Sequence, residues 1–253
     1  MLLISDKRKE KNMNKVLVID DEKPTLSMFR LLLGSCGYTV LTAENASSGL
    51  DIFKREKPPI VLTDVKMPGM DGLEVLERIK GIDPETEVIV ITGHGDMDLA
   101  AKALNLNATD FINKPIQKSD LDSALRRAEE RLKLAKGQVN EISLQTLNDV
   151  YVMDIVGNVT SLSEQSLVDT YEKASERGAT KILMRFDEYA SINGAGLAIL
   201  IQLLSESKRR NQIVTITGLS ENFKRIFEMV GITEFAKVFD DEKDAVKSFA
   251  QNG

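Results

Sequence analysis

Five polar side chains of this chain stand where apolar, strand-like runs end. Asp20 and Asp21 follow 16–19, Asp64 follows 60–63, Thr92 follows 88–91 and Lys114 follows 110–112. Clustered carboxylates repel one another, and a hard cation such as Mg²⁺ relieves that repulsion. A lysine and a hydroxyl beside such a metal indicate an anionic oxygen ligand, for example a phosphoryl group. These residues therefore supply what phosphoryl transfer needs: a carboxylate acceptor, a metal and a cation for the phosphoryl oxygens.

The elements that must position these residues alternate from Val16 to about Ala135. Strands are predicted at 16–19, 38–42, 60–63, 88–91 and 110–112, and helices at 24–36, 45–56, 72–80, 96–105 and 117–135. This alternation predicts an α/β fold with a doubly wound, five-stranded parallel sheet and helices on both faces. Taken alone, Asp20 and Asp21 also fit a solvated turn capped by aspartate. Parallel strands share one carboxyl-end edge, where such sheets bind ligands, so we expect the polar side chains to meet there.

Residues 14–136 resemble the receiver domain of bacterial two-component response regulators, which has a flavodoxin-like fold. The matching residues, in this order, are Asp20-Asp21, the segment 64–72, Thr92 and Lys114-Pro115. The resemblance implies that a sensor histidine kinase phosphorylates Asp64 and that Lys114 pairs with the phosphate. It also implies a Mg²⁺ ion held by Asp20, Asp21, Asp64 and the backbone carbonyl of Lys66.

The same resemblance implies a switch and a cis peptide bond. Thr92 is expected to hydrogen-bond a phosphate oxygen, and Phe111 to turn inward when it does, although Phe111 also fits an ordinary core aromatic. The Lys114–Pro115 bond is expected to be cis. Lys66 and His94 take the two variable positions beside the acceptor, and we expect His94 to be a rim residue without a catalytic role.

The helix predicted over 117–135 carries one apolar stripe, and its last turns are dense in charged residues that include Arg127 and Arg131. An ordinary last helix that covers the sheet explains most of the stripe. The alternative is a helix that runs past the domain as a connector or dimer contact, so a homodimer stays open.

The second half of the chain shows a different pattern of elements. Two adjacent strands are predicted at 142–147 and 150–156, further strands at 181–186, 212–217 and 237–239, and helices at 164–177, 196–209, 220–230 and 241–250. Residues 140–250 resemble the STAS domain of anti-sigma-factor antagonists, a smaller α/β domain with a mixed sheet. The resemblance lies in the segments 156–159, 186–200 and 223–232.

One segment of the second half departs from that family. Regulated members carry an aspartate and one or two hydroxyl residues before a glycine, and a partner kinase phosphorylates the first hydroxyl. Here the positions are Asn193, Gly194, Ala195 and Gly196, with no hydroxyl or carboxylate. Serine phosphorylation is therefore not expected to control this domain, and Ser191 lies too early. The segment is expected to form a tight strand-to-helix turn, whose small surface is the predicted partner-binding site.

These resemblances predict a response regulator in which phosphorylation of Asp64 controls protein binding by the STAS domain, as in partner switching. The predicted partners are a sensor histidine kinase and an anti-sigma factor or related serine kinase or phosphatase. The alternatives are a scaffold or assembly module tuned by the receiver, or a STAS domain that binds a small ligand. An independent enzyme is least expected, because the second half has no histidine, no cysteine and no evident nucleophile–base pair.

Composition supports two domains in one chain of 253 residues. A net charge of −6 and a pI near 5.1 argue against a nucleic-acid surface. No apolar run approaches the length of about 18 residues that spans a bilayer, so we expect a cytoplasmic protein without membrane insertion. Cys36 excludes an internal disulfide and is expected to be a small buried thiol. Met13 is a plausible start, so residues 1–12 are expected to be a loose tail or no part of the native protein.

Overall fold

The computed structural model describes residues 14–93, 96–134, 141–188 and 190–250. His94, the tail 1–12 and the predicted helix end at Ala135 lie outside these ranges. The chain divides into two compact units at the junction between Lys136 and Gly137, and each unit is described by itself.

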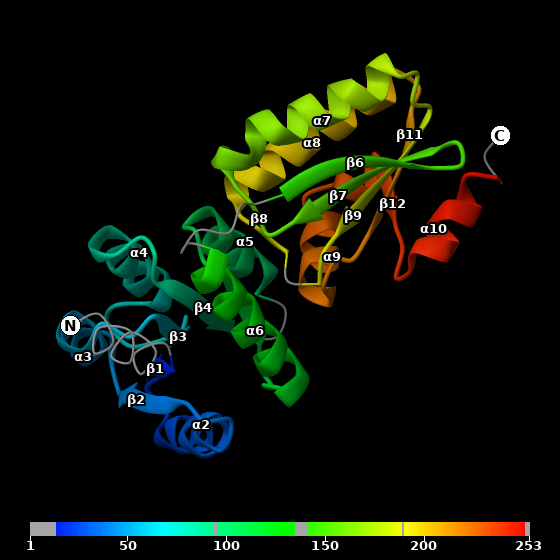
Figure 1. Ribbon diagram of the computed structural model, residues 1–253. Helices are drawn as coiled ribbons and strands as arrows, with labels where there is room; N and C mark the ends of the chain where they lie inside the picture. The colour runs from blue at the N-terminus through cyan, green and yellow to red at the C-terminus, as the bar shows by residue number, and fades with distance from the viewer. Residues whose placement is uncertain (1–13, 94–95, 135–140, 189, 251–253) are drawn as a thin grey trace, which may run out of the picture. The chain divides into compact units, whose positions relative to one another are not determined.

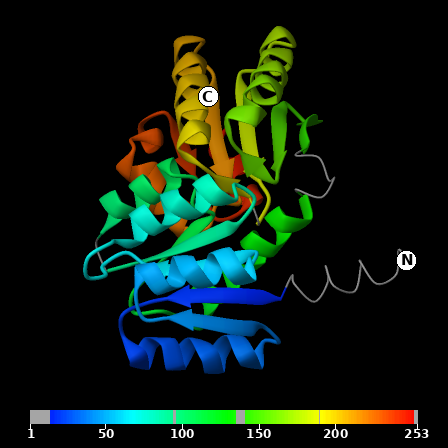
Figure 2. The ribbon, with the colours of Figure 1, turned by 90° about the vertical axis from the view of Figure 1, so that its left-hand side faces the viewer.

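The first unit is built on a five-stranded, all-parallel sheet in the order β2-β1-β3-β4-β5. Its strands are β1 (Lys15–Ile19), β2 (Thr39–Ala43), β3 (Ile60–Asp64), β4 (Glu87–Thr92) and β5 (Asp110–Asn113). Its helices are α2 (Lys23–Ser35), α3 (Ala46–Glu56), α4 (Gly72–Ile82), α5 (Met97–Asn105) and α6 (Lys118–Leu134). Figures 1 and 2 show α2 on one side of the sheet and α3 and α4 on the other. The predicted doubly wound architecture is confirmed.

The second unit has a separate five-stranded mixed sheet in the order β12-β11-β9-β7-β6. Its strands are β6 (Glu141–Leu147), β7 (Val150–Val156), β9 (Lys181–Phe186), β11 (Ile213–Thr217) and β12 (Ala236–Val238). Its helices are α7 (Glu164–Glu176), α8 (Gly194–Arg209), α9 (Glu221–Met229) and α10 (Glu242–Ser248), with the single-turn helices η1 (Ser161–Ser163) and η2 (Ile232–Glu234). Strand β6 runs antiparallel to β7, and the other pairs of this sheet are parallel.

The helices of the second unit lie on both faces of this sheet. Helices α7 and α8 run side by side over one face (Figures 1 and 2). Ala245 of α10 and Phe249, which directly follows the helix, pack against Val150, Val152 and Leu183 of the other face. The sequence pattern missed one feature, a two-stranded parallel sheet of β8 (Asn158–Val159) and β10 (Ser191–Ile192). Strands of two residues are too short to show an alternating pattern.

The start of α8 is a tight turn, as predicted. The Asn193 side chain caps the helix by accepting a hydrogen bond from the backbone N–H of Gly196 at 2.9 Å. A Cβ atom on Gly196 would lie 2.2 Å from the carbonyl oxygen of Val159, so only glycine allows this approach. The turn therefore holds α8 against the β8 backbone.

The prediction that Cys36 is buried is wrong, because its side chain is exposed. Cys36 lies just past the last turn of α2, where its backbone N–H donates to the carbonyl oxygen of Leu33 at 3.1 Å. Leu33 provides the apolar contact of this helix end and is buried, so the thiol is left outside the core.

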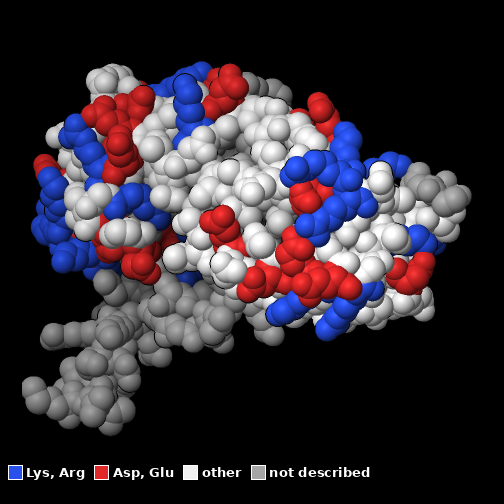
Figure 3. All heavy atoms as spheres, turned by 90° about the horizontal axis from the view of Figure 1, so that it is seen from above, with Lys and Arg blue, Asp and Glu red and all other residues white. Residues whose placement is uncertain are grey.

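Charged side chains of both signs are mixed on the face of the molecule drawn in Figure 3. Lys and Arg side chains lie among Asp and Glu side chains, with uncharged surface between them. None of the helices in the described part of the chain is long and apolar enough to cross a membrane.

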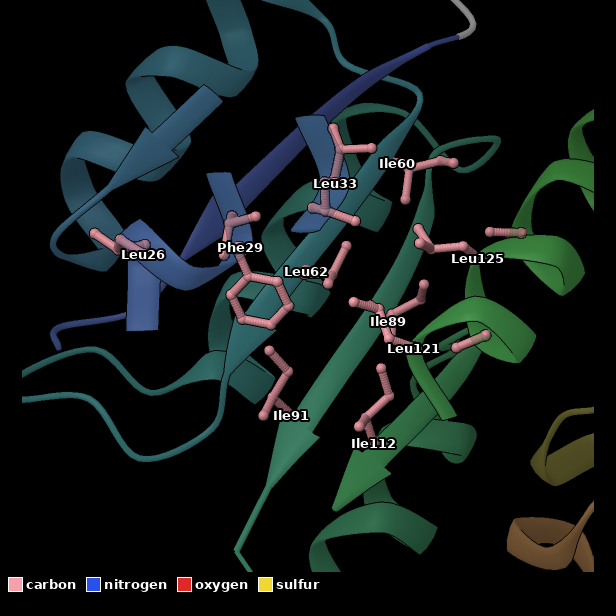
Figure 4. Close-up of a cluster of buried hydrophobic side chains, with 14 of the residues drawn as sticks. Leu26, Phe29, Leu33, Ile60, Leu62, Ile89, Ile91, Ile112, Leu121 and Leu125 are labelled. Carbon is pink, nitrogen blue, oxygen red and sulfur yellow. The ribbon is translucent and has the colours of Figure 1, made fainter. Parts of the chain in front are cut away.

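The core of the first unit joins α2 and α6 to one face of the sheet. Figure 4 shows Phe29 and Leu33 from α2, Leu62 from β3 and Leu121 and Leu125 from α6 converging in this layer. All five side chains are buried. Burial of apolar surface stabilises the folded state by roughly 25 cal/mol per Å². This apolar layer therefore holds the strands, and hence their carboxyl ends, in a fixed register.

Two ion pairs attach α6 to the sheet. The Arg127 guanidinium pairs with the Asp110 carboxylate, and both side chains are buried. One turn further along, Arg131 Nε lies 2.6 Å from Glu87 Oε2 at the start of β4. Two of the charges predicted to crowd the helix surface are thus turned inward, onto the helix's own sheet.

Candidate functional site

The predicted acceptor residues meet at the carboxyl-end edge of the first sheet. Asp20 follows β1, while Asp64 and Thr92 are the last residues of β3 and β4. Lys114 follows β5, and its Nζ atom lies 2.9 Å from Asp64 Oδ1 and 3.5 Å from Asp20 Oδ2. The Lys114 ammonium, just after β5, therefore reaches carboxylates at the ends of β1 and β3.

Burial makes this cluster electrostatically demanding. Asp20 is fully buried and Asp64 is 4% exposed. Burial raises the pKa of Asp64, and the nearby charges of Asp21 and Glu22 raise it further, while Lys114 opposes the shift. Burial likewise raises the pKa of Asp20, against the lowering effects of the Glu22 backbone N–H and of Lys114. Both carboxylates thus lack enough positive charge around them, which is the setting that favours a bound cation.

Lys114 responds in the opposite sense to the carboxylates. Burial by itself lowers the pKa of Lys114, but the hydrogen bond and charge of Asp64, together with the charge of Asp20, outweigh it and raise that pKa. Lys114 is therefore a cation at neutral pH. Its position fits a group that holds an anion on Asp64.

Local backbone contacts fix the two buried carboxylates. The backbone N–H of Glu22 donates to Asp20 Oδ1 at 2.8 Å, which orients that carboxylate after the strand ends. On the other side, α4 begins against β3, and the Gly72 N–H donates to the Val65 carbonyl oxygen at 2.9 Å. A Cβ atom on Gly72 would lie 2.0 Å from the Asp64 carbonyl oxygen. The start of α4 is thus in close contact with the backbone of Asp64.

The two predicted switch residues are both fully buried. The Thr92 hydroxyl donates to Asn113 Oδ1 at 3.0 Å, across the register pair of β4 and β5. Phe111 lies in the core. The Lys114–Pro115 peptide bond is cis, as predicted. The roles of Thr92 and Phe111 in switching remain predictions.

Three residues of this region were not singled out from the sequence. Glu22 orients Asp20, Asn113 holds the Thr92 hydroxyl, and Asp96 forms an ion pair with Lys66 at 2.8 Å. Glu22 and Asn113 adjoin the predicted site residues Asp21 and Lys114 in the sequence, so adjacency was an available signal. Asp96 had no such signal, because its partner lies on a different loop.

The predicted metal ligands meet only in part. No three His, Cys, Asp or Glu side chains lie close enough to hold a metal ion in the part of the chain that the structure describes. The predicted set also includes the backbone carbonyl of Lys66, which is not a side chain. Asp21 is near enough to Asp64 for its charge to raise the pKa of Asp64. Buried carboxylate oxygens with raised pKa values are hard donors that suit Mg²⁺.

The predicted partner surface of the second unit lies around the start of α8. Ala195 is exposed, and Gly194 is half-buried. The Ser191 hydroxyl is buried and donates to Asn158 Oδ1 at 2.8 Å, so it faces the interior. Single-turn helix η1 lies against α8 and carries Leu162, which is 88% exposed. Leu162 is a further surface residue that the sequence pattern did not mark, because its run is short.

Comparison with known families matches both halves of the chain. The family described as "Response regulator receiver domain" matches residues 16–126. The family described as "STAS domain" matches residues 141–245.

Three curated relatives show how far the similarity extends. The chain is 34% identical to sporulation initiation phosphotransferase F of Bacillus subtilis over 113 residues, 45% of this chain and 91% of that protein. It is 34% identical to the transcriptional regulatory protein FixJ of Bradyrhizobium diazoefficiens over 152 residues, 58% of this chain and 67% of that protein. It is 37% identical to the C4-dicarboxylate transport transcriptional regulatory protein DctD of Rhizobium meliloti over 119 residues, 47% of this chain and only 26% of that protein.

Proposed function

The chain belongs to the response regulators, with a receiver domain followed by a STAS domain, and we propose that phosphorylation of Asp64 controls which protein the STAS domain binds. The observation that carries the proposal is the contact of Lys114 Nζ with Asp64 Oδ1 at 2.9 Å in a buried, carboxylate-rich edge. A sensor histidine kinase is the proposed phosphoryl donor. The domain limits that we propose are 14–136 and 140–250.

The acceptor edge is the carboxyl-end edge of the first sheet, where Asp20, Asp64, Thr92 and Lys114 lie. Each of its residues has a proposed task. Asp64 attacks the phosphoryl group through a carboxylate oxygen and forms an acyl phosphate, while the donor's leaving group departs with the bonding electron pair. Lys114 holds a phosphoryl oxygen by charge and hydrogen bonding. Thr92 exchanges its hydrogen bond to Asn113 for one to the phosphoryl group. Phe111, which was expected to turn inward when it does, is already buried in this structure.

Asp20, Asp21, Asp64 and the backbone carbonyl of Lys66 are the proposed ligands of a Mg²⁺ ion. When bound, the ion supplies positive charge that offsets the buried carboxylates and the incoming phosphoryl oxygens. Chelation of divalent cations with EDTA should therefore abolish phosphorylation of Asp64.

A direct test is to incubate the protein with phosphoramidate and Mg²⁺ and to measure its intact mass. We expect one phosphoryl group that hydroxylamine removes, because an acyl phosphate reacts with that nucleophile. Asp64→Ala should abolish the label, whereas Asp51→Ala, at an exposed position of α3, should retain it. Labelling of Asp64→Ala at the wild-type level would contradict the acceptor assignment.

The output of the STAS domain is proposed to be protein binding at the start of α8. No side chain from Asn193 to Gly196 carries a hydroxyl, and the nearby Ser191 hydroxyl is buried, which supports control from Asp64 rather than by serine phosphorylation. The proposed partner is an anti-sigma factor or a related serine kinase or phosphatase. Exposed Leu162 beside this turn adds apolar area to the same surface.

The partner can be tested by affinity capture from the source cells with two baits. One bait is the protein with Mg²⁺ and beryllofluoride, and the other is Asp64→Ala. A partner of the anti-sigma class captured in one state supports switching, and its loss in Leu162→Asp but not in Leu31→Asp places the contact at the α8 surface. Leu31 is a suitable control because it is also strongly exposed, on α2. Identical captures in both states would contradict switching and favour a scaffold.

A further inference from the structure

One ion pair connects the loop after the acceptor strand with the start of α5. Lys66 lies two residues after Asp64, and Asp96 is the residue directly before α5. Lys66 Nζ lies 2.8 Å from Asp96 Oδ2. This Oδ2 atom is shielded from solvent and accepts no hydrogen bond from the residues that the structure describes. The Lys66 ammonium is thus the group that offsets the charge of Asp96.

Gly93 provides the space in which the Asp96 carboxylate sits. A Cβ atom on Gly93 would lie 2.7 Å from Asp96 Oδ2 and 3.8 Å from Lys66 Nζ. Gly93 is not among the glycines with a positive φ, so its backbone conformation does not require glycine. Glycine at position 93 therefore leaves space for the ion pair, whereas the backbone conformation does not require it.

The same carboxylate leaves a helix end without its usual cap. Asp96 is the N-cap residue of α5, yet its side chain makes no capping hydrogen bond. Asn45 and Asp71 both cap their helices, α3 and α4, through their side chains. An N-cap aspartate ordinarily accepts from the second or third helical N–H. Here the third, that of Leu99, already donates to the backbone carbonyl oxygen of Asp96 at 3.0 Å, so the second, that of Asp98, is the donor for the side chain. Asp96 thus has two competing partners, Lys66 and its own helix.

We propose that Asp96 is a positioning residue that holds Lys66 in the resting protein and, once Asp64 is phosphorylated, releases Lys66 and caps α5. This inference rests on the proposed role of Asp64. A phosphoryl group on Asp64 adds negative charge on the loop of Lys66 and competes for its ammonium. The released carboxylate finds N–H donors and a favourable helix dipole at α5, so the exchange replaces one interaction with another. The side chain of Asp96 therefore has two arrangements, and phosphorylation selects between them.

The affinity for beryllofluoride in the presence of Mg²⁺ tests this proposal. Asp96→Asn removes the ion pair but keeps a side chain that can cap α5, so the affinity should rise about two- to five-fold, the range for an exposed ion pair. Asp96→Ala loses both partners and should produce a smaller rise. Gly93→Ala changes no charge but displaces the carboxylate, and it should also raise the affinity. Far-ultraviolet circular dichroism verifies that each variant folds.

Two controls separate the ion pair from a general charge effect. Asp98→Asn neutralises an exposed carboxylate in the first turn of the same helix and should leave the affinity within about two-fold of wild type. In a Lys66→Met background, Asp96→Asn should have no more effect than Asp98→Asn. An undiminished rise in that background would overturn the proposal, because the effect would then come from charge alone.

Hydrogen exchange supplies a second readout. On addition of beryllofluoride, the amide of Asp98 should become more protected in wild type and in Asp96→Asn, but not in Asp96→Ala. Unchanged protection in wild type, with beryllofluoride bound, would overturn the capping step while leaving Asp64 as the acceptor. Equal binding by wild type and Asp64→Ala would instead reject the proposed function itself, and the inference with it.

Discussion

Three side chains determine the charge balance of the acceptor edge. The Asp20 and Asp64 carboxylates are buried at the ends of the neighbouring strands β1 and β3. The Lys114 ammonium lies within 3.5 Å of both. Burial raises the pKa of both carboxyl groups in spite of Lys114. This charge balance fits the metal and the phosphoryl group that we propose for the edge, and it comes at some cost to the stability of the free protein.

Asp20 offers a test of that cost. Because burial raises its pKa, the folded state holds a proton on this carboxyl at a higher pH than the unfolded chain does. Ionised Asp20 therefore lowers stability at neutral pH, and the loss disappears as the pH falls through the raised pKa. Without metal, Asp20→Asn should raise the free energy of unfolding at pH 7 by on the order of 1 kcal/mol, with a difference that shrinks towards a pH of about 4.

Urea denaturation at several pH values measures this difference. Asp21→Asn is the matched control, because Asp21 is exposed and its neutralisation should change stability by less than about 0.5 kcal/mol. A lower unfolding free energy for Asp20→Asn at neutral pH would mean that pairing with Lys114 outweighs the cost of burial.

At the scale of elements, helix starts and buried pairs set where the strand ends lie. Helix α4 begins against the Asp64 backbone, and only glycine at position 72 permits that contact. Helix α6 is fastened through Arg127 to Asp110 in β5, three residues before Asn113 and four before Lys114. The position of Lys114 thus depends on packing at the far side of the same strand.

Gly72→Ala should displace the Asp64 backbone, because its Cβ would lie 2.0 Å from the Asp64 carbonyl oxygen. We expect a loss of about 1–3 kcal/mol in stability, as for other overpacked sites, and slower phosphorylation by phosphoramidate. Gly81→Ala in the same helix meets nothing within 4 Å and should keep both properties. Wild-type phosphorylation by a folded Gly72→Ala protein would show that the acceptor tolerates this displacement.

Arg127→Met should leave the Asp110 carboxylate buried without its partner. Breaking a buried ion pair in this way costs about 3–5 kcal/mol. Arg126→Met, on the exposed side of α6, should cost less than about 0.5 kcal/mol. Thermal or urea unfolding compares the two variants, and equal stabilities would mean that the Arg127–Asp110 pair contributes no net attachment of α6.

At the scale of the whole molecule, the chain is two units with separate sheets and cores. Each sheet has its own apolar layer, exemplified by Phe29 and Leu121 in the first unit and Leu183 and Phe249 in the second. The control of the second unit by Asp64 that we propose therefore requires a change in how the units interact with each other or with a partner.

The two halves should fold independently. We expect fragments 14–136 and 140–250 each to unfold cooperatively in urea, and the first to be phosphorylated on Asp64 at the rate of the full chain. Circular dichroism and intact mass provide the two readouts. A second fragment without a cooperative transition would show that its sheet depends on the receiver.

The order of the strands and helices and the chemistry of the acceptor edge follow from local sequence patterns. Buried parallel strands with polar residues at their carboxyl ends have a strong local pattern, so the pattern alone predicts that Asp64 and Lys114 lie together. The same holds for the turn at Gly196, where a glycine in the first turn of a helix indicates close backbone approach.

Tertiary packing, in contrast, determines which charged side chains face inward and which hydroxyl groups form hydrogen bonds inside the protein. Arg127 and Arg131 belong to a helix whose sequence looks highly charged, yet both pair with carboxylates from strands that precede it in the chain. Cys36 was expected inside and lies outside, and the partner of Asp96 is Lys66 on another loop. Such contacts join residues that are distant in sequence, and a local pattern carries no information about which of many possible partners packing will bring within hydrogen-bonding distance.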